Sequence, residues 1–170
     1  AKGKNFRHKI YKDYKANRSS MPAELSEQVL PIIQFIKSLG IKVLQIPDVE
    51  ADDVIGTLAA FDYGKNINIT ISSGDKDLAQ LVNDNVTLIN SMDEKRLDIK
   101  GVIDKFGVHP KKIFDYLVLV GDTSDNIPGV DKIGPKTAVT LLEKYGSIDG
   151  IIENIDLLKG KVQENLGKSS

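Results

Sequence analysis

The sequence predicts an α/β protein in which a parallel sheet covered by helices comes first and a small helical region follows. Two observations lead to this fold class. Short runs rich in isoleucine and valine alternate with helical patterns as far as about residue 98, and such alternation is typical of a parallel sheet with helices on both faces. From Ile99 onward the patterns are only helical. We therefore expect one domain at 1–98 and a second at 99–170.

The elements of the first domain follow from periodicity and from helix-start and helix-stop residues. Pro22 and Glu24 open a helix whose apolar residues recur at helical spacing, and Gly40 closes it. The stretch from Asn66 to Ser72 alternates and is rich in isoleucine, which indicates a strand. In chain order we expect a basic helix at 5–19, a helix at about 22–39, a strand at 42–46, a helix at 51–61, a strand at 66–72, a short helix at 74–82 and a strand at 86–90.

The second domain has helical spacing in four segments and no strand pattern. These segments lie near 99–106, 110–120, 135–145 and 147–154. Pro135 and the glycines around it mark turns between the helices.

Composition describes a soluble globular protein, with 41% apolar and 28% charged residues. The absence of cysteine excludes disulfides, thiol catalysis and zinc–thiolate sites. No apolar run approaches the roughly 20 residues of a membrane span, and no signal peptide is recognisable. We therefore expect no membrane association.

The net charge of −1 hides an uneven distribution. The first 18 residues hold seven Lys or Arg against one acid, Asp13, whereas residues 48–84 hold eight acids against Lys65 and Lys76. A basic end beside an acidic middle suits a polyanion held next to a divalent-metal site. Two solvated charged faces would give the same distribution.

Two acidic pairs follow the ends of predicted strands, where an open α/β sheet has its site crevice. These pairs are Asp48 with Glu50 and Asp75 with Asp77. Each pair could simply cap a helix. Two clusters at neighbouring strand ends would instead repel each other unless cations were bound. Oxygen ligands without Cys or His favour magnesium or manganese over zinc.

A third acidic pair, Asp122 and Asp125, precedes a glycine-rich stretch, GVDKIGPKT. The spacing i, i+3 lets both carboxylates point at one ion, although a plain turn would have the same composition. The glycines resemble a nucleotide-binding P-loop, but Pro135 separates Gly134 from Lys136 and removes one backbone N–H. A P-loop NTPase is therefore the weakest of the functional hypotheses.

Three motifs together resemble a known family. EADDVIGTLA (50–59), SGDKDLAQLV (73–82) and GDTSDNIPGVDKIGPKTA (121–138) are similar to the 5′ nuclease domain of bacterial DNA polymerase I, in the flap endonuclease superfamily. The resemblance extends over essentially the whole chain. It implies a PIN-like 5′ nuclease core with a helical arch at 1–22, and a helix–three-turn–helix (helix–hairpin–helix) element at about 120–146.

The resemblance also implies two divalent ions, Mg²⁺ or Mn²⁺. Glu50 and Asp52 are similar to ligands of the first metal, and Asp53 to an acid beside them. The second metal would be held, directly or through water, by four carboxylates: Asp75, Asp77, Asp122 and Asp125.

Basic residues and the hairpin are implied to bind DNA. Lys15 and Arg18, in YKANR, resemble the arch residues that grip the scissile phosphate, with Arg7 assisting. The hairpin residues implied to hold a phosphate of the duplex are Gly129, Lys132, Gly134, Lys136 and Thr137. Hairpin carbonyls in this family can also hold a potassium ion.

The function implied is hydrolysis of phosphodiester bonds in flapped, nicked or primer-bearing duplexes, including RNA primer–DNA hybrids, during replication and repair. We also expect a monomer, a linked polymerase domain downstream, and a bacterial cytoplasmic, nucleoid-associated location. Family members carry two further metal-binding aspartates upstream of the stretch matching residues 1–4, and neither is in this sequence. The N-terminal strands would then be missing, and we expect this chain to bind branched DNA better than it cuts it. The alternative is a non-catalytic module that binds branched DNA through the hairpin with an incomplete metal site.

Overall fold

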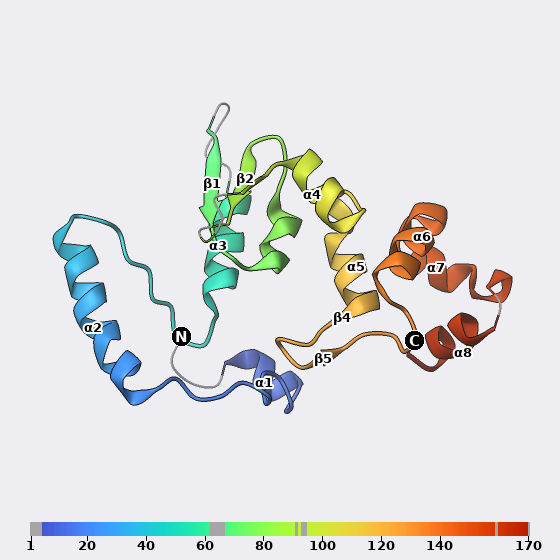
Figure 1. The fold of residues 1–170 in the computed structure, drawn as a ribbon, viewed down its shortest axis with the longest axis horizontal. Coiled ribbons are helices and arrows are strands. Elements are labelled where there is room, and N and C mark those ends of the chain that lie inside the picture. The colour runs from blue at the N-terminus through green and yellow to red at the C-terminus, as the bar shows by residue number, and fades with distance from the viewer. Residues whose placement is uncertain (1–4, 62–66, 91, 93–94, 159, 170) are drawn as a thin grey trace. The chain divides into compact units, whose positions relative to one another are not determined.

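The computed structural model describes residues 5–61, 67–90, 92, 95–158 and 160–169 (Figure 1). The chain divides into two compact units. Unit 1 consists of Ala1–Val54 with Ser124–Asn126, and unit 2 of Ile55–Thr123 with Ile127–Ser170. The α/β class with a following helical part is confirmed. The predicted division at residue 98 stays a prediction.

Unit 1 begins with a helix that is much shorter than the predicted basic helix. Helix α1 spans Phe6–Ile10, and Asn5 caps it by accepting a hydrogen bond from the Arg7 N–H at 3.0 Å. The prediction of a helix to residue 19 is wrong, because Tyr11 is extended and Lys15 has a φ of 57°. The Lys15 N–H instead donates to the carbonyl of Asp125 at 3.0 Å. Tertiary contacts thus replace the helical hydrogen bonds.

Helix α2 spans Ala23–Ser38, close to its predicted range, with Gly40 at a φ of 77° just beyond it. The predicted strand at 42–46 does not form: within the described parts of the chain these residues are in no sheet. A strand needs a neighbour for its backbone hydrogen bonds, and apolar content alone does not supply one. Helix α3, Ala51–Ala60, begins in unit 1 and continues in unit 2, as predicted for 51–61.

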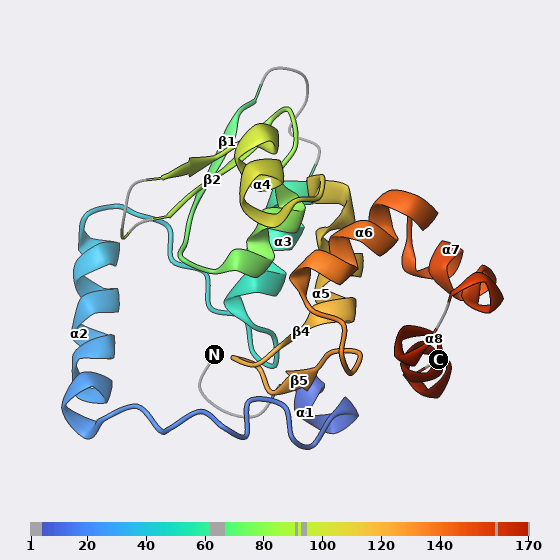
Figure 2. The same ribbon diagram turned by 45° about the vertical axis from the view of Figure 1, so that its right-hand side comes forward.

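Unit 2 contains a three-stranded sheet in the order β1-β2-β3, of which Figure 2 labels β1 and β2. Strand β1 (Ile69–Ser72) pairs in parallel with β2 (Val86–Ile89), with Ile69 opposite Val86. The 3-10 helix η1 (Lys76–Leu81) lies between them in the chain, near the predicted helix. Strand β3 (Arg96–Leu97) then pairs antiparallel with β2, so the sheet is mixed rather than wholly parallel. Strand β3 was not predicted from the sequence, because a strand of two residues is too short to show an alternating pattern.

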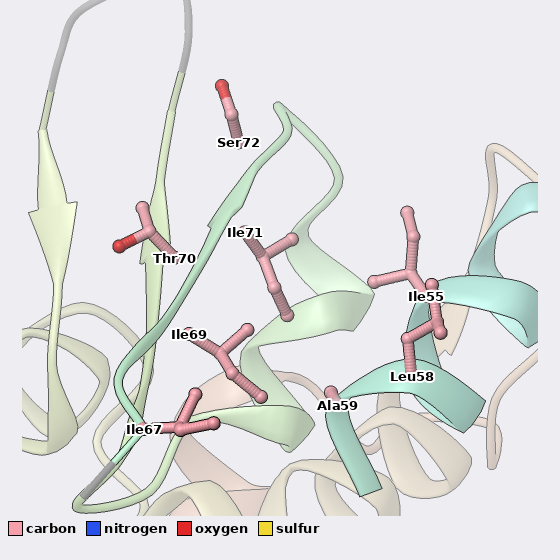
Figure 3. A pocket seen from close by; sticks show the side chains of 8 residues that line it. All are labelled: Ile55, Leu58, Ala59, Ile67, Ile69, Thr70, Ile71 and Ser72. Carbon is pink, nitrogen blue, oxygen red and sulfur yellow. The ribbon is translucent and has the colours of Figure 1, made fainter. Parts of the chain in front are cut away.

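One face of this sheet contributes to the core. Ile71 and Leu88 are buried there, together with Leu78 of η1. Thr70 and Ser72 are exposed, so the expected cover of helices on both faces is not found at β1. Beside β1, the apolar side chains of α3 and of the strand line an open pocket of about 450 Å³ (Figure 3). These lining residues include Ile55, Leu58 and Ala59 of α3 and Ile67, Ile69 and Ile71 of the strand segment.

The rest of unit 2 is helical, as predicted, apart from two short strands that pair with each other. The elements are α4 (Ile99–Phe106), η2 (Pro110–Lys112), α5 (Ile113–Val120), β4 (Gly121–Asp122), β5 (Ile127–Pro128), α6 (Pro135–Tyr145), α7 (Ile148–Glu153), η3 (Ile155–Leu157) and α8 (Lys161–Ser169). Helix α6 packs against α5 and α7. Its buried residues Ala138 and Leu142 join Ile113 of α5 and Ile151 of α7 in the core. Throughout the described residues, no helix is long and apolar enough to cross a membrane.

Candidate functional site

Three basic and three acidic side chains form a connected set of ion pairs in unit 1, which we call the unit 1 cluster. Its members are Arg7, Lys15, Arg18, Glu50, Asp53 and Asp125. All six were predicted as site residues from the sequence. The basic N-terminal segment therefore does not form a solvated helix face, because its three predicted DNA-binding cations contact the predicted metal ligands.

Arg7 and Asp53 form the most regular pair of the unit 1 cluster. Arg7 donates through both terminal nitrogens, at 2.8 Å to Oδ2 and 2.7 Å to Oδ1 of Asp53. Asp53 Oδ2 also accepts the backbone N–H of Glu50 at 2.8 Å, which satisfies one donor at the start of α3. The hydrogen bonds from Arg7 lower the pKa of Asp53. Helix capping thus accounts for part of this acidic cluster.

Glu50 is held by Lys15 and Tyr14. Lys15 Nζ donates to Oε1 at 2.7 Å, and the Tyr14 hydroxyl donates to Oε2 at 2.7 Å. Burial by itself raises the pKa of Glu50, but the hydrogen bonds from Lys15 and Tyr14 together with the nearby positive charges lower it overall. Glu50 is therefore a carboxylate at neutral pH, and Lys15 neutralises its charge.

Asp125 approaches the same two side chains. The Tyr14 hydroxyl donates to its Oδ2 at 2.9 Å, and Lys15 Nζ lies 3.5 Å from that atom. Arg18 adds an ion pair to Oδ1 and a hydrogen bond from Nε to the carbonyl of Ser124 at 3.0 Å. Tyr14 and Lys15 thereby join Glu50 of the α3 start to Asp125, which is 75 positions later in the sequence.

The remaining predicted second-metal ligands lie in unit 2. Asp75 caps η1 by accepting the N–H of Asp77 at 2.9 Å, which is the capping role that the sequence allowed. Oδ1 of Asp77 is a buried atom. Asp122, at the end of β4, is buried and receives Lys76 Nζ on Oδ1 at 3.1 Å. Lys76 stands between Asp75 and Asp77 in the sequence.

The glycine-rich stretch forms a close turn between β5 and α6. A Cβ on Gly129 would lie 2.3 Å from the carbonyl carbon of Val120, so this glycine is required by backbone packing. Gly134 caps α6 with a φ of −93°, and a Cβ there would meet nothing within 4 Å. Because Gly134 has no side chain, the space beside the first turn of α6 is open. This packing role for Gly129 was not expected from the sequence.

The basic residues of the hairpin are exposed at the start of α6. Lys132 is exposed and adopts a φ of 64°, and Lys136 is exposed in the first helical turn. Thr137, the next residue, is half-buried. Helix N-termini attract anions, because their first N–H groups have no intrahelical partner.

The carboxylates of both units are chemically suited to hard divalent ions, since all their donor atoms are oxygens. Within the described residues, no three His, Asp or Glu side chains are arranged to hold a metal ion. In unit 1 the carboxylates Glu50, Asp53 and Asp125 are each engaged by Lys or Arg, and Asp52 is half-buried in the first turn of α3. The assignment of individual metal ligands stays a prediction.

Sequence reasoning missed two side chains that organise these carboxylates. Tyr14 is 5% exposed, and its single hydroxyl proton is shared between Glu50 and Asp125. An aromatic residue between lysines, in YKDYK, was a signal that this segment packs rather than forming a solvated helix. The second side chain that was missed is Lys76, which lies inside the acidic motif GDKD.

The comparison with family models then places the chain. Residues 1–107 match the model described as 5'-3' exonuclease, N-terminal resolvase-like domain. The chain belongs to the 5'-3' exonuclease family. Residues 108–170 match the second model of this family, the C-terminal SAM fold. The resemblance inferred from the three motifs is confirmed.

The relatives of this 5'-3' exonuclease family member are named either DNA polymerase I or 5'-3' exonuclease. The chain is 46% identical to DNA polymerase I of Pseudomonas aeruginosa, over 97% of the chain and 19% of the relative. It is 50% identical to the 5'-3' exonuclease of Buchnera aphidicola subsp. Baizongia pistaciae, over 90% of the chain and 51% of the relative. The chain thus spans about half of the shorter relatives and about a fifth of the polymerases.

A solved structure has the same fold. The flap endonuclease of bacteriophage T5, in a pseudo-enzyme–product complex with DNA and metal ions, superposes with a TM-score of 0.85. The match covers 99% of this chain and 66% of the phage chain, at 24% sequence identity.

Proposed function

We propose that the chain is part of a divalent-metal-dependent 5′ nuclease that hydrolyses phosphodiester bonds in flapped, nicked or primer-bearing duplex DNA during replication and repair. Membership of the 5'-3' exonuclease family supports the reaction class. The phage flap endonuclease with DNA and metal ions, which has the same fold, supports the substrate and the ions. The linked polymerase of some relatives supports a role in replication and repair.

The observation that carries the proposal is the contact of the predicted phosphate-gripping cations with predicted metal ligands. Lys15 reaches Glu50 at 2.7 Å, and Arg18 pairs with Asp125. A nuclease site needs cations for the phosphate beside carboxylates for the metal, and the unit 1 cluster has both. Lys15 and Arg18 can exchange a carboxylate oxygen for a phosphate oxygen, because both groups accept the same charge-assisted hydrogen bonds.

Two divalent ions, Mg²⁺ or Mn²⁺, fit the oxygen donors. In unit 1, Glu50 and Asp52, with Asp53 beside them, would hold the first ion. In unit 2, Asp75, Asp77 and Asp122 would hold the second, and the part of Asp125 in it stays a sequence-based prediction. When bound, such ions supply an activated water and stabilise the leaving oxygen. The chain's own contribution is to keep the carboxylates ionised, as Lys15 and Tyr14 do for Glu50.

The turn before α6 is proposed to hold a phosphate of the duplex. Gly134 leaves open space at the helix start, and Lys132 and Lys136 are exposed around it. Backbone N–H groups at this helix start can bind a phosphate oxygen, while the lysines add charge. We also propose that backbone carbonyl groups of the same turn bind a potassium ion.

Anisotropy titration of a labelled flap duplex tests the cationic part of the proposal. We expect Lys15→Met and Arg18→Met each to weaken binding and to reduce the slope of log affinity against log salt by about one contact. Lys9→Met is the matched control, because Lys9 is an exposed lysine of α1 outside the unit 1 cluster. Equal losses in all three variants would mean that only the overall charge matters, which would remove Lys15 and Arg18 from the site.

A further inference from the structure

Lys76 is a basic residue among acids in unit 2. It follows Asp75 and precedes Asp77 in the sequence, and its Nζ lies 3.1 Å from Oδ1 of Asp122. The Asp122 side chain is only 8% exposed, whereas that of Lys76 is 44% exposed. The ammonium group therefore approaches a buried carboxylate from the solvent side.

All three carboxylates act on this ammonium group. Burial by itself lowers the pKa of Lys76, but the hydrogen bond to Asp122 and the negative charges of Asp122, Asp77 and Asp75 raise it overall. Lys76 is thus within electrostatic range of every predicted second-metal ligand of unit 2. The 3.1 Å contact of Lys76 Nζ with Asp122 Oδ1 is the geometric observation that ties Lys76 to these acids, and Asp75 and Asp77 flank it in the sequence.

We propose that Lys76 is a positioning residue that occupies the acidic group of Asp75, Asp77 and Asp122 as its internal countercharge, and that a divalent ion must displace it to bind. This inference rests on the proposed function, in which these carboxylates take the second metal. A hard cation and an ammonium group compete for the same carboxylate oxygens, and both cannot contact Asp122 Oδ1 at full strength.

The chemistry of lysine suits a displaceable countercharge. Its ammonium group is a strongly hydrated point charge on a flexible stem, so it can leave Asp122 for water at little cost. An arginine at this position would hold a carboxylate through two parallel hydrogen bonds and would be harder to displace. Lys76 thereby keeps the three acids from repelling one another without a metal while allowing a metal to enter.

Two measurements on purified chains test this inference. Calorimetric titration with Mn²⁺ is expected to show affinity about tenfold tighter in Lys76→Met than in the wild type, and weaker affinity in Lys76→Arg. The melting temperature of Lys76→Met should fall in EDTA and return towards the wild-type value in saturating Mn²⁺. A purely structural role would lower it equally in both conditions.

The controls separate this inference from the proposed function. Lys100→Met removes an exposed ion pair with Asp104 in the same unit and should leave Mn²⁺ affinity unchanged. If the wild type binds Mn²⁺ no better than Asp75→Asn, the proposed metal site fails, and the inference fails with it. If Asp75→Asn weakens binding but Lys76→Met leaves it unchanged or weaker, the countercharge inference alone is wrong. Should Lys76→Met not fold by circular dichroism, Lys76→Gln takes its place with the same expected results.

Discussion

The Tyr14 hydroxyl donates to Glu50 Oε2 at 2.7 Å, although 36 residues separate the two in the sequence. The same hydroxyl contacts Asp125 at 2.9 Å, so one buried phenol connects two carboxylates predicted to bind metal. Tyr14 also adds a hydrogen bond that keeps Glu50 ionised.

Tyr14→Phe should destabilise unit 1 by about 1–3 kcal/mol, because two carboxylates lose a hydrogen-bond donor. Urea denaturation followed by circular dichroism measures this loss. Tyr11→Phe is the matched control, since Tyr11 is 37% exposed and should change stability by less than about 0.5 kcal/mol. Equal stability of Tyr14→Phe and the wild type would show that the phenol hydrogen bonds contribute nothing to the folded state.

Arg7 and Asp53 should be energetically coupled. In a double-mutant cycle of Arg7→Gln and Asp53→Asn, we expect a coupling energy of about 0.5–1 kcal/mol, a modest value because both side chains are partly exposed. The cycle is measured by urea denaturation of the four chains. Additive effects of the two substitutions would mean that the bidentate pair has no net energetic role.

Acid should weaken unit 1 through Glu50 and Asp53. Both pKa values are lowered in the folded chain, so their contribution to stability is present above the ordinary carboxyl values, 4.5 and 3.8. It is lost as pH falls through the lower folded values, because the unfolded chain then binds more protons. We expect the free energy of unfolding to fall between about pH 6 and pH 3, and less steeply in Glu50→Gln/Asp53→Asn. An unchanged slope of the unfolding free energy against pH in that variant would contradict the assignment.

The two glycines of the hairpin should behave differently when substituted. Gly129→Ala would place a Cβ 2.3 Å from the Val120 carbonyl carbon and should destabilise the chain by about 1–3 kcal/mol or more. Gly134→Ala meets nothing within 4 Å at an ordinary φ and should cost less than about 1 kcal/mol, because the only loss is that alanine is a poorer N-cap than glycine. Thermal melting of both variants measures the difference. Similar melting temperatures would contradict the packing assigned to Gly129.

Gly134 should matter for DNA rather than for the fold. Gly134→Val is expected to weaken duplex binding by blocking close approach of a phosphate to the start of α6, while the melting temperature stays near the wild-type value. Lys136→Ala should act more weakly and reduce the salt slope by about one phosphate contact. Duplex affinity that is unchanged in Gly134→Val would remove the hairpin from the proposed interface.

Local patterns predicted most elements of this fold. Helices α2, α3, α4 and α6 are close to their expected ranges, because each has apolar residues at helical spacing and a clear start or stop. The expected strand at 42–46 failed because pairing depends on residues distant in the sequence. Helix α1 is short for a similar reason: Tyr14 and Lys15 find partners at Glu50 and Asp125, which local propensity cannot reveal.

The candidate site was predictable in its residue types but not in its contacts. Motifs identified the acids and the basic residues, yet no pattern could indicate that Lys15 and Arg18 would lie on Glu50 and Asp125. The positions of Tyr14 and Lys76 depend on burial and on partners far along the chain. These contacts form only in the tertiary structure, and local sequence patterns do not indicate them.

Cleavage of a 5′-labelled flap duplex tests the central claim most directly. Wild type, Asp75→Asn and the control Asp104→Asn are each incubated in excess over the duplex for long times, in Mg²⁺ and in EDTA, because cleavage by this chain is expected to be slow. We predict labelled 5′ fragments only in Mg²⁺, from the wild type and Asp104→Asn, with a loss on the order of 100-fold in Asp75→Asn. Flap binding without any Mg²⁺-dependent fragment, or equal cleavage by Asp75→Asn, would contradict the account, and the first result would favour the non-catalytic DNA-binding alternative.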